Sequence, residues 1–426
     1  MPEYKKKKVK KHLISQKKPK FAKVDITEEQ DVEMQPKSKA KFKPQKKRLN
    51  VIKGNKLRRI RKVRIFLATV ALALVSVILL SVLLPVGIFE NVNNLISVLG
   101  NGTYPFELYG SQTLNAVSSG NYYYVLTDTN VNIRSNNGKE ILTISHGFEK
   151  PVIKVTNTRT LVFDQGGNNL FVANLQKKTG EKTFNDTILN AAICRSGTYA
   201  VAYNADNYAS VVSVFDKKNK LLYEWYSAEE TVNNVALSPN GKKLAITTIT
   251  ASGGKLKSKL YVFKYDSANP VFSLDLGEEL VYSLDSGIGS GFAIVLKNGF
   301  KFVNWSKYES VNYSTDLQIS YFKSNSNIMV AVSALASNKG DNKVAVFNKK
   351  GKLISEFDFN GIISDIQISK NHIYCMSETL VSIYSKEGEL LRTAECEFGA
   401  VRLAILSAYS VAVIMNDGVS QLEIKK

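Results

Sequence analysis

The chain has 426 residues with 57 Lys and Arg against 37 Asp and Glu, a net charge of +20. Residues 1–64 hold 24 basic and 6 acidic residues (net +18), which leaves 33 and 31 (net +2) for the other 362. A uniformly basic protein would suggest nucleic-acid binding, but here the charge marks a tail on a nearly neutral body. Three Cys exclude a disulfide-rich scaffold, and three His do not favour a histidine metal centre.

Residues 1–64 are predicted to be a disordered, basic cytoplasmic tail. Lysines recur there without a helical or strand period, and the sparse apolar residues cannot offset the entropy of ordering the chain. Aromatic side chains are not interleaved with the lysines as a stacking platform would require, so nucleic acid is not favoured as a partner of the tail.

Residues 65–89 are 25 residues without a charged side chain. About 20 apolar residues span a bilayer as a helix, so the run predicts an uncleaved transmembrane signal anchor. A buried core helix and a cleaved signal peptide are the alternatives, which the length of the run and the lack of a small-residue cleavage site do not favour.

The flanks of this run predict its orientation. Seven basic residues precede it and Glu90 follows it, so the positive-inside rule places the N-terminus in the cytoplasm and the C-terminal body outside the cell. The predicted location is therefore the cell membrane, crossed once. We also expect the basic residues to contact anionic lipids of the inner leaflet: Lys53, Lys56, Arg58, Arg59, Arg61, Lys62 and Arg64.

Residues 90–104 are a predicted linker, and residues 105–426 are predicted to be all-β. A strand, a turn rich in Lys, Asn and Gly, and another strand recur, as in VSVFDKKNKLLY (Val212–Tyr223) and VAVFNKKGKLIS (Val344–Ser355). Units of about forty residues with four antiparallel strands are typical of β-propeller blades. Equivalent positions lie 37 to 48 residues apart: Arg134, Leu175, Phe215, Phe263, Asn304, Phe347, Tyr384 and Leu422.

These eight units predict an eight-bladed β-propeller, with seven blades as the alternative. The last unit, residues 400–426, has only three strands, whereas the strand at residues 105–110 has no unit of its own. We therefore predict that this first strand completes the last blade and closes the ring.

The stretch VALSPNGKKLAI (Val235–Ile246) resembles a motif of WD40-like and quinoprotein-like propellers. With its basic tail, single span and repeating body, the chain also resembles an uncharacterised family of membrane proteins of Gram-positive bacteria, classed as a domain of unknown function. The resemblance implies a membrane-anchored propeller outside the cell and transfers no catalytic residues.

Several near-matches to catalytic signatures are incomplete. Trp225 and Trp305 occupy different positions in their units, unlike the recurrent Trp of quinoproteins, and are predicted to pack the core. His146 and His372 lie beside turns of different units, and no G-x-S-x-G nucleophile motif occurs. The sequence therefore predicts no catalytic residue, no cofactor and no enzyme.

Two loop patterns and the cysteines are likewise interpreted structurally. Gly287, Gly289 and Gly291 precede a strand rather than a helix, so they predict a turn and not a phosphate loop. Asp128, Asn130 and Asn132 have the alternate spacing of a calcium loop, but Ile133 replaces its glycine, so a hairpin turn and no metal site is expected. Three free, largely buried thiols are predicted: Cys194, Cys375 and Cys396.

The predicted function is a non-enzymatic binding or scaffold module for an extracytoplasmic protein or cell-wall polymer. Thr250–Lys259 and Ala336–Asn342 are its candidate variable loops. The alternative is an extracellular hydrolase or oxidoreductase with an axial active site, which three or more convergent ionisable side chains would favour. Asp365 is the one strong candidate charge recognised on the innermost strands. The sequence does not identify the ligand, the binding face or the oligomeric state.

Overall fold

The computed structural model describes residues 61–72, 100–335 and 338–425. The chain divides into two units, residues 1–79 and 80–426. In the first, residues 61–72 form a helix whose side chains are all exposed, including Arg61, Lys62 and Arg64. Among the described residues, no helix combines the length and the hydrophobicity needed to cross a membrane. Lys53, Lys56, Arg58, Arg59 and most of the charge-free run lie outside the described residues, so the anchor and its lipid contacts stay predictions.

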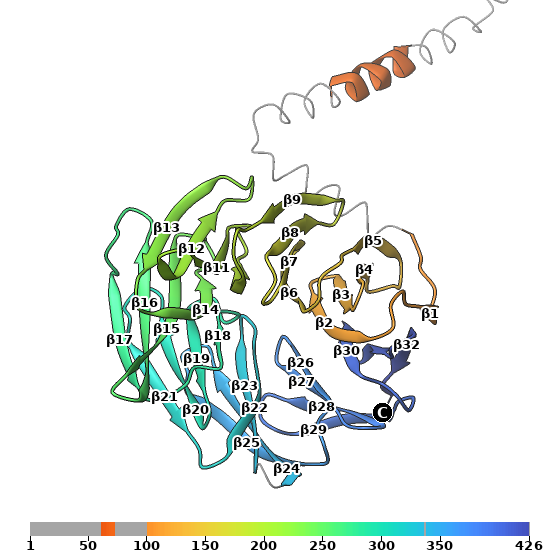
Figure 1. Ribbon diagram of the computed structural model, residues 1–426. Helices are drawn as coiled ribbons and strands as arrows, with labels where there is room; N and C mark the ends of the chain where they lie inside the picture. The colour runs from red at the N-terminus through yellow and green to blue at the C-terminus, as the bar shows by residue number, and fades with distance from the viewer. Residues whose placement is uncertain (1–60, 73–99, 336–337, 426) are drawn as a thin grey trace, which may run out of the picture. The chain divides into compact units, whose positions relative to one another are not determined.

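The second unit contains eight four-stranded antiparallel sheets arranged as blades around an axis (Figure 1). This confirms the eight-bladed propeller, and the seven-blade alternative is wrong. The first blade is formed by β2 (Thr113–Ser119), β3 (Tyr122–Thr127), β4 (Asn130–Ser135) and β5 (Glu140–Ser145), and the second by β6 (Pro151–Thr156), β7 (Arg159–Asp164), β8 (Asn169–Asn174) and β9 (Lys178–Thr183). The third blade is formed by β10 (Ile188–Ile193), β11 (Tyr199–Ala205), β12 (Tyr208–Phe215) and β13 (Leu221–Ser227), and the fourth by β14 (Thr231–Leu237), β15 (Lys243–Ser252), β16 (Lys255–Lys264) and β17 (Phe272–Gly277).

The other four blades follow the same order from the axis outward. The fifth blade is formed by β18 (Ser283–Asp285), β19 (Gly291–Leu296), β20 (Gly299–Asn304) and β21 (Ser310–Ser314), and the sixth by β22 (Gln318–Ser324), β23 (Ile328–Leu335), β24 (Asn338–Asn348) and β25 (Leu353–Asn360). The seventh blade is formed by β26 (Asp365–Ser369), β27 (His372–Met376), β28 (Leu380–Ser385) and β29 (Leu390–Glu395), and the eighth by β30 (Arg402–Ser407), β31 (Ser410–Ile414), β32 (Gly418–Glu423) and β1 (Phe106–Glu107).

The last of these blades closes the ring as predicted. Its fourth strand, β1, comes from the start of the body and pairs with β32, with Phe106 opposite Val419 (Figure 1). The Leu108 N–H then donates to the Asp417 carbonyl at 3.0 Å, and the Leu108 side chain is buried. Every strand and every buried hydrophobic cluster of the described propeller lies within residues 106–424, so this part of the chain contains the whole fold.

The recurring Lys/Asn/Gly turn joins the third and fourth strands of a blade. In several blades a side chain before the turn caps it. In two of these turns, Asp216 accepts from the N–H groups of residues 218 and 220, and Asn348 from those of residues 350 and 352. Asn219 and Gly351 then take positive φ values of 65° and 79°, which the sharp reversal requires. The lysines of these turns therefore contribute charge and not turn geometry.

The core lies between neighbouring blades. Phe300 of β20 packs with Met329 of β23 and Phe347 of β24 in one buried cluster, so two blades share it. The second strands are buried along most of their length, whereas the fourth strands alternate between exposed and covered residues. Blade packing thus buries both faces of the central strands, which no single four-stranded blade could do.

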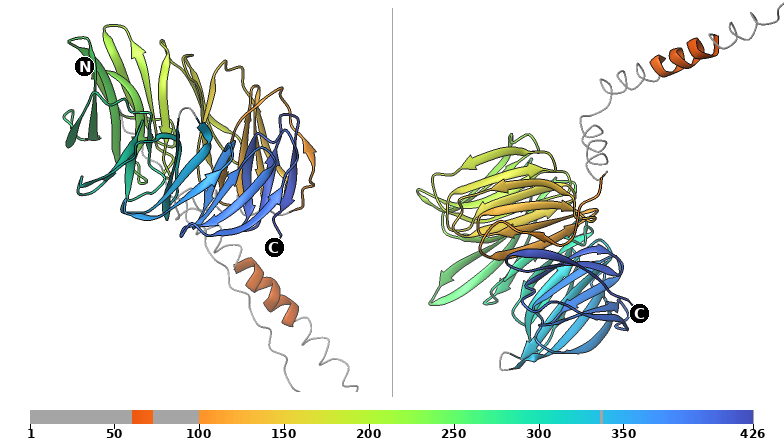
Figure 2. Two further views of the ribbon diagram at one scale, coloured as in Figure 1. Left: turned by 90° about the horizontal axis from the view of Figure 1, so that it is seen from below. Right: turned by 90° about the vertical axis from the view of Figure 1, so that its right-hand side faces the viewer.

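Antiparallel strand order sends the connections alternately to two opposite faces of the disc (Figure 2). We call "first face" the side that carries the turns between first and second strands and between third and fourth strands of each blade. The "second face" carries the turns between second and third strands and the loops that lead to the next blade. A pocket that joins the turns at residues 120–121, 136–139 and 370–371 agrees with this assignment of the first face.

Candidate functional site

Most side chains that resemble catalytic residues in the sequence have structural roles. Trp225 packs 5.4 Å from Phe263, and Trp305 packs 4.5 Å from Phe292, measured between ring centroids. His146 follows β5 and His372 begins β27, each beside a connection as predicted. The packing and turn predictions for these four residues are confirmed.

The predicted turns are confirmed in both segments. Gly287 and Gly289 lie in the turn between β18 and β19. Asp128 lies in the turn between β3 and β4, where its carboxylate accepts from the Ser111 N–H at 2.9 Å and from the Ser111 hydroxyl. The hydrogen bond from the Ser111 hydroxyl lowers the pKa of Asp128. Both bonds tie the turn to the loop after β1.

The three cysteines are free in the structure, as predicted, with Cys194 and Cys375 buried and Cys396 half-buried. Burial raises the pKa of the Cys375 thiol to about 12. The thiolate is the reactive species, so we expect iodoacetamide at pH 8 to modify Cys375 in the native protein far more slowly than Cys396, as followed by mass spectrometry. In unfolding concentrations of urea all three should react alike, and equal native rates would contradict the assigned burial.

The candidate variable loop at Thr250–Lys259 is a β-hairpin rather than an irregular loop, and a role in recognition stays a prediction. β15 and β16 continue into this segment, with Ser252 paired to Lys255, so that only Gly253 and Gly254 form the turn. Pairing of β15 with β16 across ten positions makes it a long hairpin on the second face. In the other candidate, Asn338–Asn342 belong to β24, and residues 336–337 lie outside the described part.

The innermost strands carry more charge than the sequence reading recognised. Asp365 is buried on β26, but charged residues also lie on four other innermost strands of the ring. They are Lys154 on β6, Asp285 on β18, Lys323 on β22 and Arg402 on β30. The expectation of a single axial charge is therefore wrong. For Asp285 the reason is that a strand as short as Ser283–Asp285 lacks the pattern that marks the other first strands.

These axial charges are partly neutralised by one another and by hydrogen bonds. Burial raises the pKa of Asp285 and of Asp365, and the positive charge of Lys323 opposes both shifts. The Asp365 carboxylate accepts from the Ile366 and Leu403 N–H groups, each at 2.9 Å, and from the Gln367 amide at 3.0 Å. Since Leu403 belongs to the next blade, Asp365 fastens two blades together.

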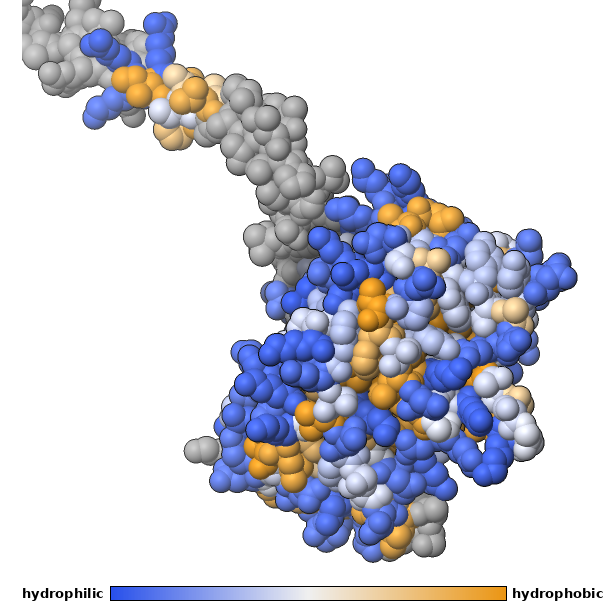
Figure 3. Space-filling model, turned by 90° about the vertical axis from the view of Figure 1, so that its left-hand side faces the viewer, coloured by the Kyte–Doolittle hydropathy of each residue, from blue (hydrophilic) through white to orange (hydrophobic). Residues whose placement is uncertain are grey.

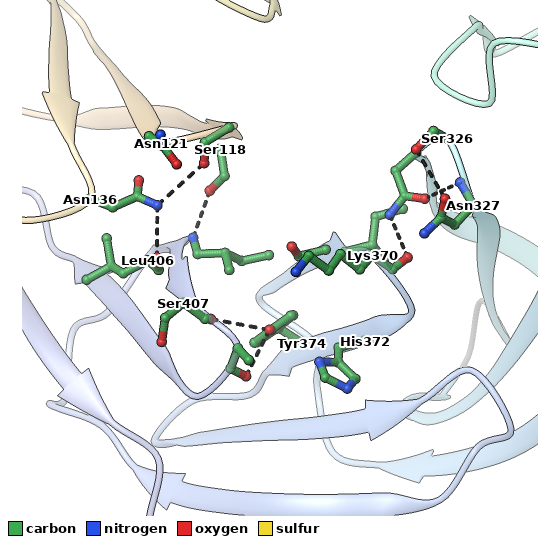
Figure 4. Close-up of a pocket in the computed structure, with 16 residues that line it drawn as sticks. Ser118, Asn121, Asn136, Ser326, Asn327, Lys370, His372, Tyr374, Leu406 and Ser407 are labelled. Carbon is green, nitrogen blue, oxygen red and sulfur yellow. Dashed lines mark hydrogen bonds between the residues drawn. The ribbon is translucent and has the colours of Figure 1, made fainter. Parts of the chain in front are cut away.

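The axial opening on the first face is a polar pocket of about 490 Å³ (Figure 4). Asn136 donates to the Leu406 carbonyl at 2.8 Å, and the Tyr374 hydroxyl donates to the Ala408 carbonyl at 3.0 Å. These bonds join neighbouring blades, and no carboxylate is found among the described residues that line the pocket. The polar groups of the pocket wall therefore serve mainly to hold the first-face turns of neighbouring blades together.

The two faces carry opposite charge. Connections of the first face hold 13 basic and 5 acidic residues (net +8), whereas the described connections of the second face hold 2 basic and 12 acidic residues (net −10). The first-face residues are Lys139, Lys177, Arg195, Lys217, Lys218, Lys220, Lys242, Lys307, Lys349, Lys350, Lys352, Lys370 and Lys386, against Asp216, Asp266, Glu309, Glu387 and Glu389. The second-face residues are Asp128, Glu149, Asp186, Asp206, Glu229, Glu230, Glu278, Glu279, Asp316, Glu378, Glu397 and Asp417, against Lys150 and Lys297.

Exposed apolar side chains distinguish the faces as well. Among the described connections, five large exposed apolar residues lie on the second face, and only Val271 lies on the first. The five are Tyr109, Leu280, Tyr282, Ile362 and Phe398, of which Phe398 is 79% exposed. The rim seen in Figure 3 is largely hydrophilic, with apolar side chains in separate patches. The second face thus combines negative charge with exposed apolar groups, and gathered exposed apolar groups can mark interaction sites.

A groove of about 690 Å³ opens on the second face between the sixth and seventh blades. Its apolar lining includes Ile319, Leu335, Ile362 and Ile363. Leu335 is 51% and Ile362 65% exposed, so neither side chain is packed into the core. The volume is in the usual range of ligand pockets.

The groove wall is held in place by hydrogen bonds from within the propeller. The Tyr321 hydroxyl donates to the Ile363 carbonyl at 3.0 Å, and the Asn342 amide donates to the Gly361 carbonyl at 2.8 Å. The Gly361 N–H donates in turn to the Gly340 carbonyl at 2.7 Å. The loop at residues 361–364 is therefore preorganised, which lowers the entropic cost of binding.

Sequence reasoning missed this division of the two faces. The signal was present as an alternation of Lys-rich and acidic connections along the chain. It becomes visible only when each connection is assigned to a face, and that requires the order of the strands within every blade.

Comparison with known proteins agrees with this architecture. A family model described as "Family of unknown function (DUF5711)" matches residues 106–424. The chain belongs to this family. A search of curated protein sequences finds no relative.

Solved propellers resemble this member of the family in fold. The C-terminal WD40 domain of Sif2 aligns with a TM-score of 0.53 and 11% identity, covering 77% of this chain and 100% of that one. A europium-containing methanol dehydrogenase aligns with a TM-score of 0.50 and 8% identity, covering 75% and 85%. BamB from Moraxella catarrhalis aligns with a TM-score of 0.49 and 10% identity, covering 76% and 99%. Such identities show the fold alone, and the fold hosts both binding domains and enzymes.

Proposed function

We propose that the chain is a non-enzymatic scaffold anchored in the cell membrane of a Gram-positive bacterium by residues 65–89, with its propeller outside the cell. The propeller binds an extracytoplasmic protein through its second face. The observation that carries this proposal is the preorganised apolar groove at Leu335 and Ile362, set in a face whose connections have a net charge of −10. The matching partner offers an apolar anchor flanked by basic residues.

A charge placed in the groove is expected to abolish partner binding. The variant Leu335→Glu/Ile362→Glu adds two carboxylates to an apolar contact, which should weaken binding about thirtyfold or more, as expected for loss of a binding hot spot. The measurement is capture of the partner from cell-envelope extract by the immobilised chain, followed by titration of the purified partner.

The matched control is Leu353→Glu/Ile354→Glu in the same blade. These two residues are 49% and 36% exposed at the other end of β25, so the control adds the same charge outside the groove and should leave binding unchanged. Equal loss in both variants, or no partner of the wild-type chain, would refute the proposed binding face.

An axial enzyme is the second candidate, because five charged residues lie on innermost strands. We favour the scaffold because both carboxylate oxygens of Asp365 already accept hydrogen bonds, two within β26 and one from Leu403 of the next blade. Asp365→Asn separates the two functions: a turnover that this change removes while the fold is retained supports the enzyme. Partner binding that survives the same change supports the scaffold.

A further inference from the structure

The first face is positively charged, and the proposed scaffold function does not use this charge. The net charge of +8 on its connections is spread over several blades rather than gathered in one cluster. Four of the lysines, Lys217, Lys218, Lys349 and Lys350, project from two of the capped turns and are exposed. Since Asp216 and Asn348 hold those turns, the ammonium groups are available to an external partner.

The chain enters and leaves the propeller on this same face. The Gly100 carbonyl accepts a hydrogen bond from the Asn137 amide at 2.7 Å, in the turn between β4 and β5. At the other end, the Ile424 N–H donates to the Tyr409 carbonyl at 2.8 Å, in the turn between β30 and β31. Gly100, the first described residue before the propeller, therefore lies at its basic side.

The length of the segment before Gly100 keeps the basic face close to a membrane. Ten residues, 90–99, separate Gly100 from the end of the charge-free run. Fully extended, they span about 36 Å at most. If residues 65–89 cross the bilayer, the face that the chain enters is tethered within that distance of the outer leaflet.

We propose that the first face docks onto an anionic lipid bilayer. The inference rests on the proposed membrane anchoring, and it adds the orientation of the propeller and the role of the basic face. Attraction of the first face and repulsion of the acidic second face both turn the propeller the same way. The apolar groove then points away from the membrane, where a protein partner can reach it.

The test uses residues 100–426, which contain every strand of the propeller and lack the predicted anchor. Co-sedimentation compares vesicles of phosphatidylcholine with vesicles in which about one-third of the lipid is phosphatidylglycerol. Binding is expected only to the anionic vesicles, and added salt should weaken it because charged surfaces are screened over about 10 Å. Equal binding to both vesicles, or to neither, overturns the proposal.

Charge reversal identifies the face. Lys217→Glu/Lys218→Glu/Lys349→Glu/Lys350→Glu should weaken binding to anionic vesicles at least about hundredfold, because each basic residue at such a surface contributes about fivefold. Lys150→Glu/Lys255→Glu/Lys257→Glu/Lys297→Glu makes the same change in net charge at exposed second-face positions and should retain binding. Equal loss in both variants would show a nonspecific effect of net charge and overturn the assigned face.

Two further measurements are needed. One distinguishes a lipid bilayer from a soluble phosphate polymer as the ligand, and the other distinguishes the proposed docking face from the proposed membrane anchor. A fragment that binds soluble polyphosphate but not the vesicles recognises an anionic polymer, which overturns docking to a bilayer. Carbonate extraction of the full chain from membranes tests the anchor alone. An anchored chain whose fragment ignores anionic vesicles therefore refutes the docking face and leaves the scaffold proposal intact.

Discussion

A chain that begins at Ser111 is expected to be less stable by about 3–5 kcal/mol than one that begins at Gly100. The shorter chain lacks β1, so β32 loses its outer partner and the last blade has three strands. It also loses the buried Leu108, worth about 2 kcal/mol by burial, and the packing of Phe106 against the Arg134 guanidinium at 3.7 Å. Urea unfolding followed by circular dichroism measures the difference.

A point substitution distinguishes the contribution of the Leu108 side chain to stability from that of the whole strand β1. Leu108→Ala in the longer chain should cost about 2–3 kcal/mol, because Leu108 packs among Ala116, Val419 and other buried residues where the first and last blades meet. Equal stability of the two truncations would show that the ring closes without β1, against the observed pairing.

Phe347→Ala is expected to destabilise the propeller by about 3–5 kcal/mol, the usual cost of removing a buried phenylalanine. Phe347 is 1% exposed at the recurring position near the end of a third strand. Its ring centroid lies 4.8 Å from that of Phe300 and 4.7 Å from that of Tyr313, both in the preceding blade. The substitution therefore leaves a cavity at the junction of two blades.

Phe398→Ala is the control for this measurement. The same atoms are removed from a side chain that is 79% exposed in a second-face loop, so stability should change by less than about 0.5 kcal/mol. A loss at Phe347 no larger than the loss at Phe398 would mean that the blades do not pack as observed. A loss of partner binding by the Phe398 variant would extend the binding surface beyond the groove.

The small net charge of the body results from two faces of opposite charge. A net +2 over residues 65–426 describes a nearly neutral domain, yet its connections are divided into +8 on one side and −10 on the other. A domain with this dipole is oriented by any charged surface near it. Anchoring, orientation and partner binding can then be assigned to different parts of one chain.

Much of the fold was predictable because its determinants are local. The eightfold period, the missing strand of the last unit and the turns around Asn219 and Gly351 follow from strand alternation and from residues that tolerate positive φ. Closure by residues 105–110 was predictable from strand counting alone. The long hairpin at Thr250–Lys259 was not, because its Gly and Lys content resembles a loop and pairing across ten positions decides otherwise.

The sequence by itself favoured eight blades over seven and predicted which residues turn the chain, since the repeat and its turns depend on neighbours within about forty residues. It also predicted how the ring closes, because strand counting left one strand over at the start of the body and one missing at its end. Only the tertiary structure decided which charges share a face, which inner strands bring Lys154, Asp285 and Arg402 to the axis, and that Leu335 and Ile362 line one groove. These groupings join residues from different blades. They arise because alternate connections of an antiparallel blade emerge on opposite sides, and blade packing then gathers each set into one surface.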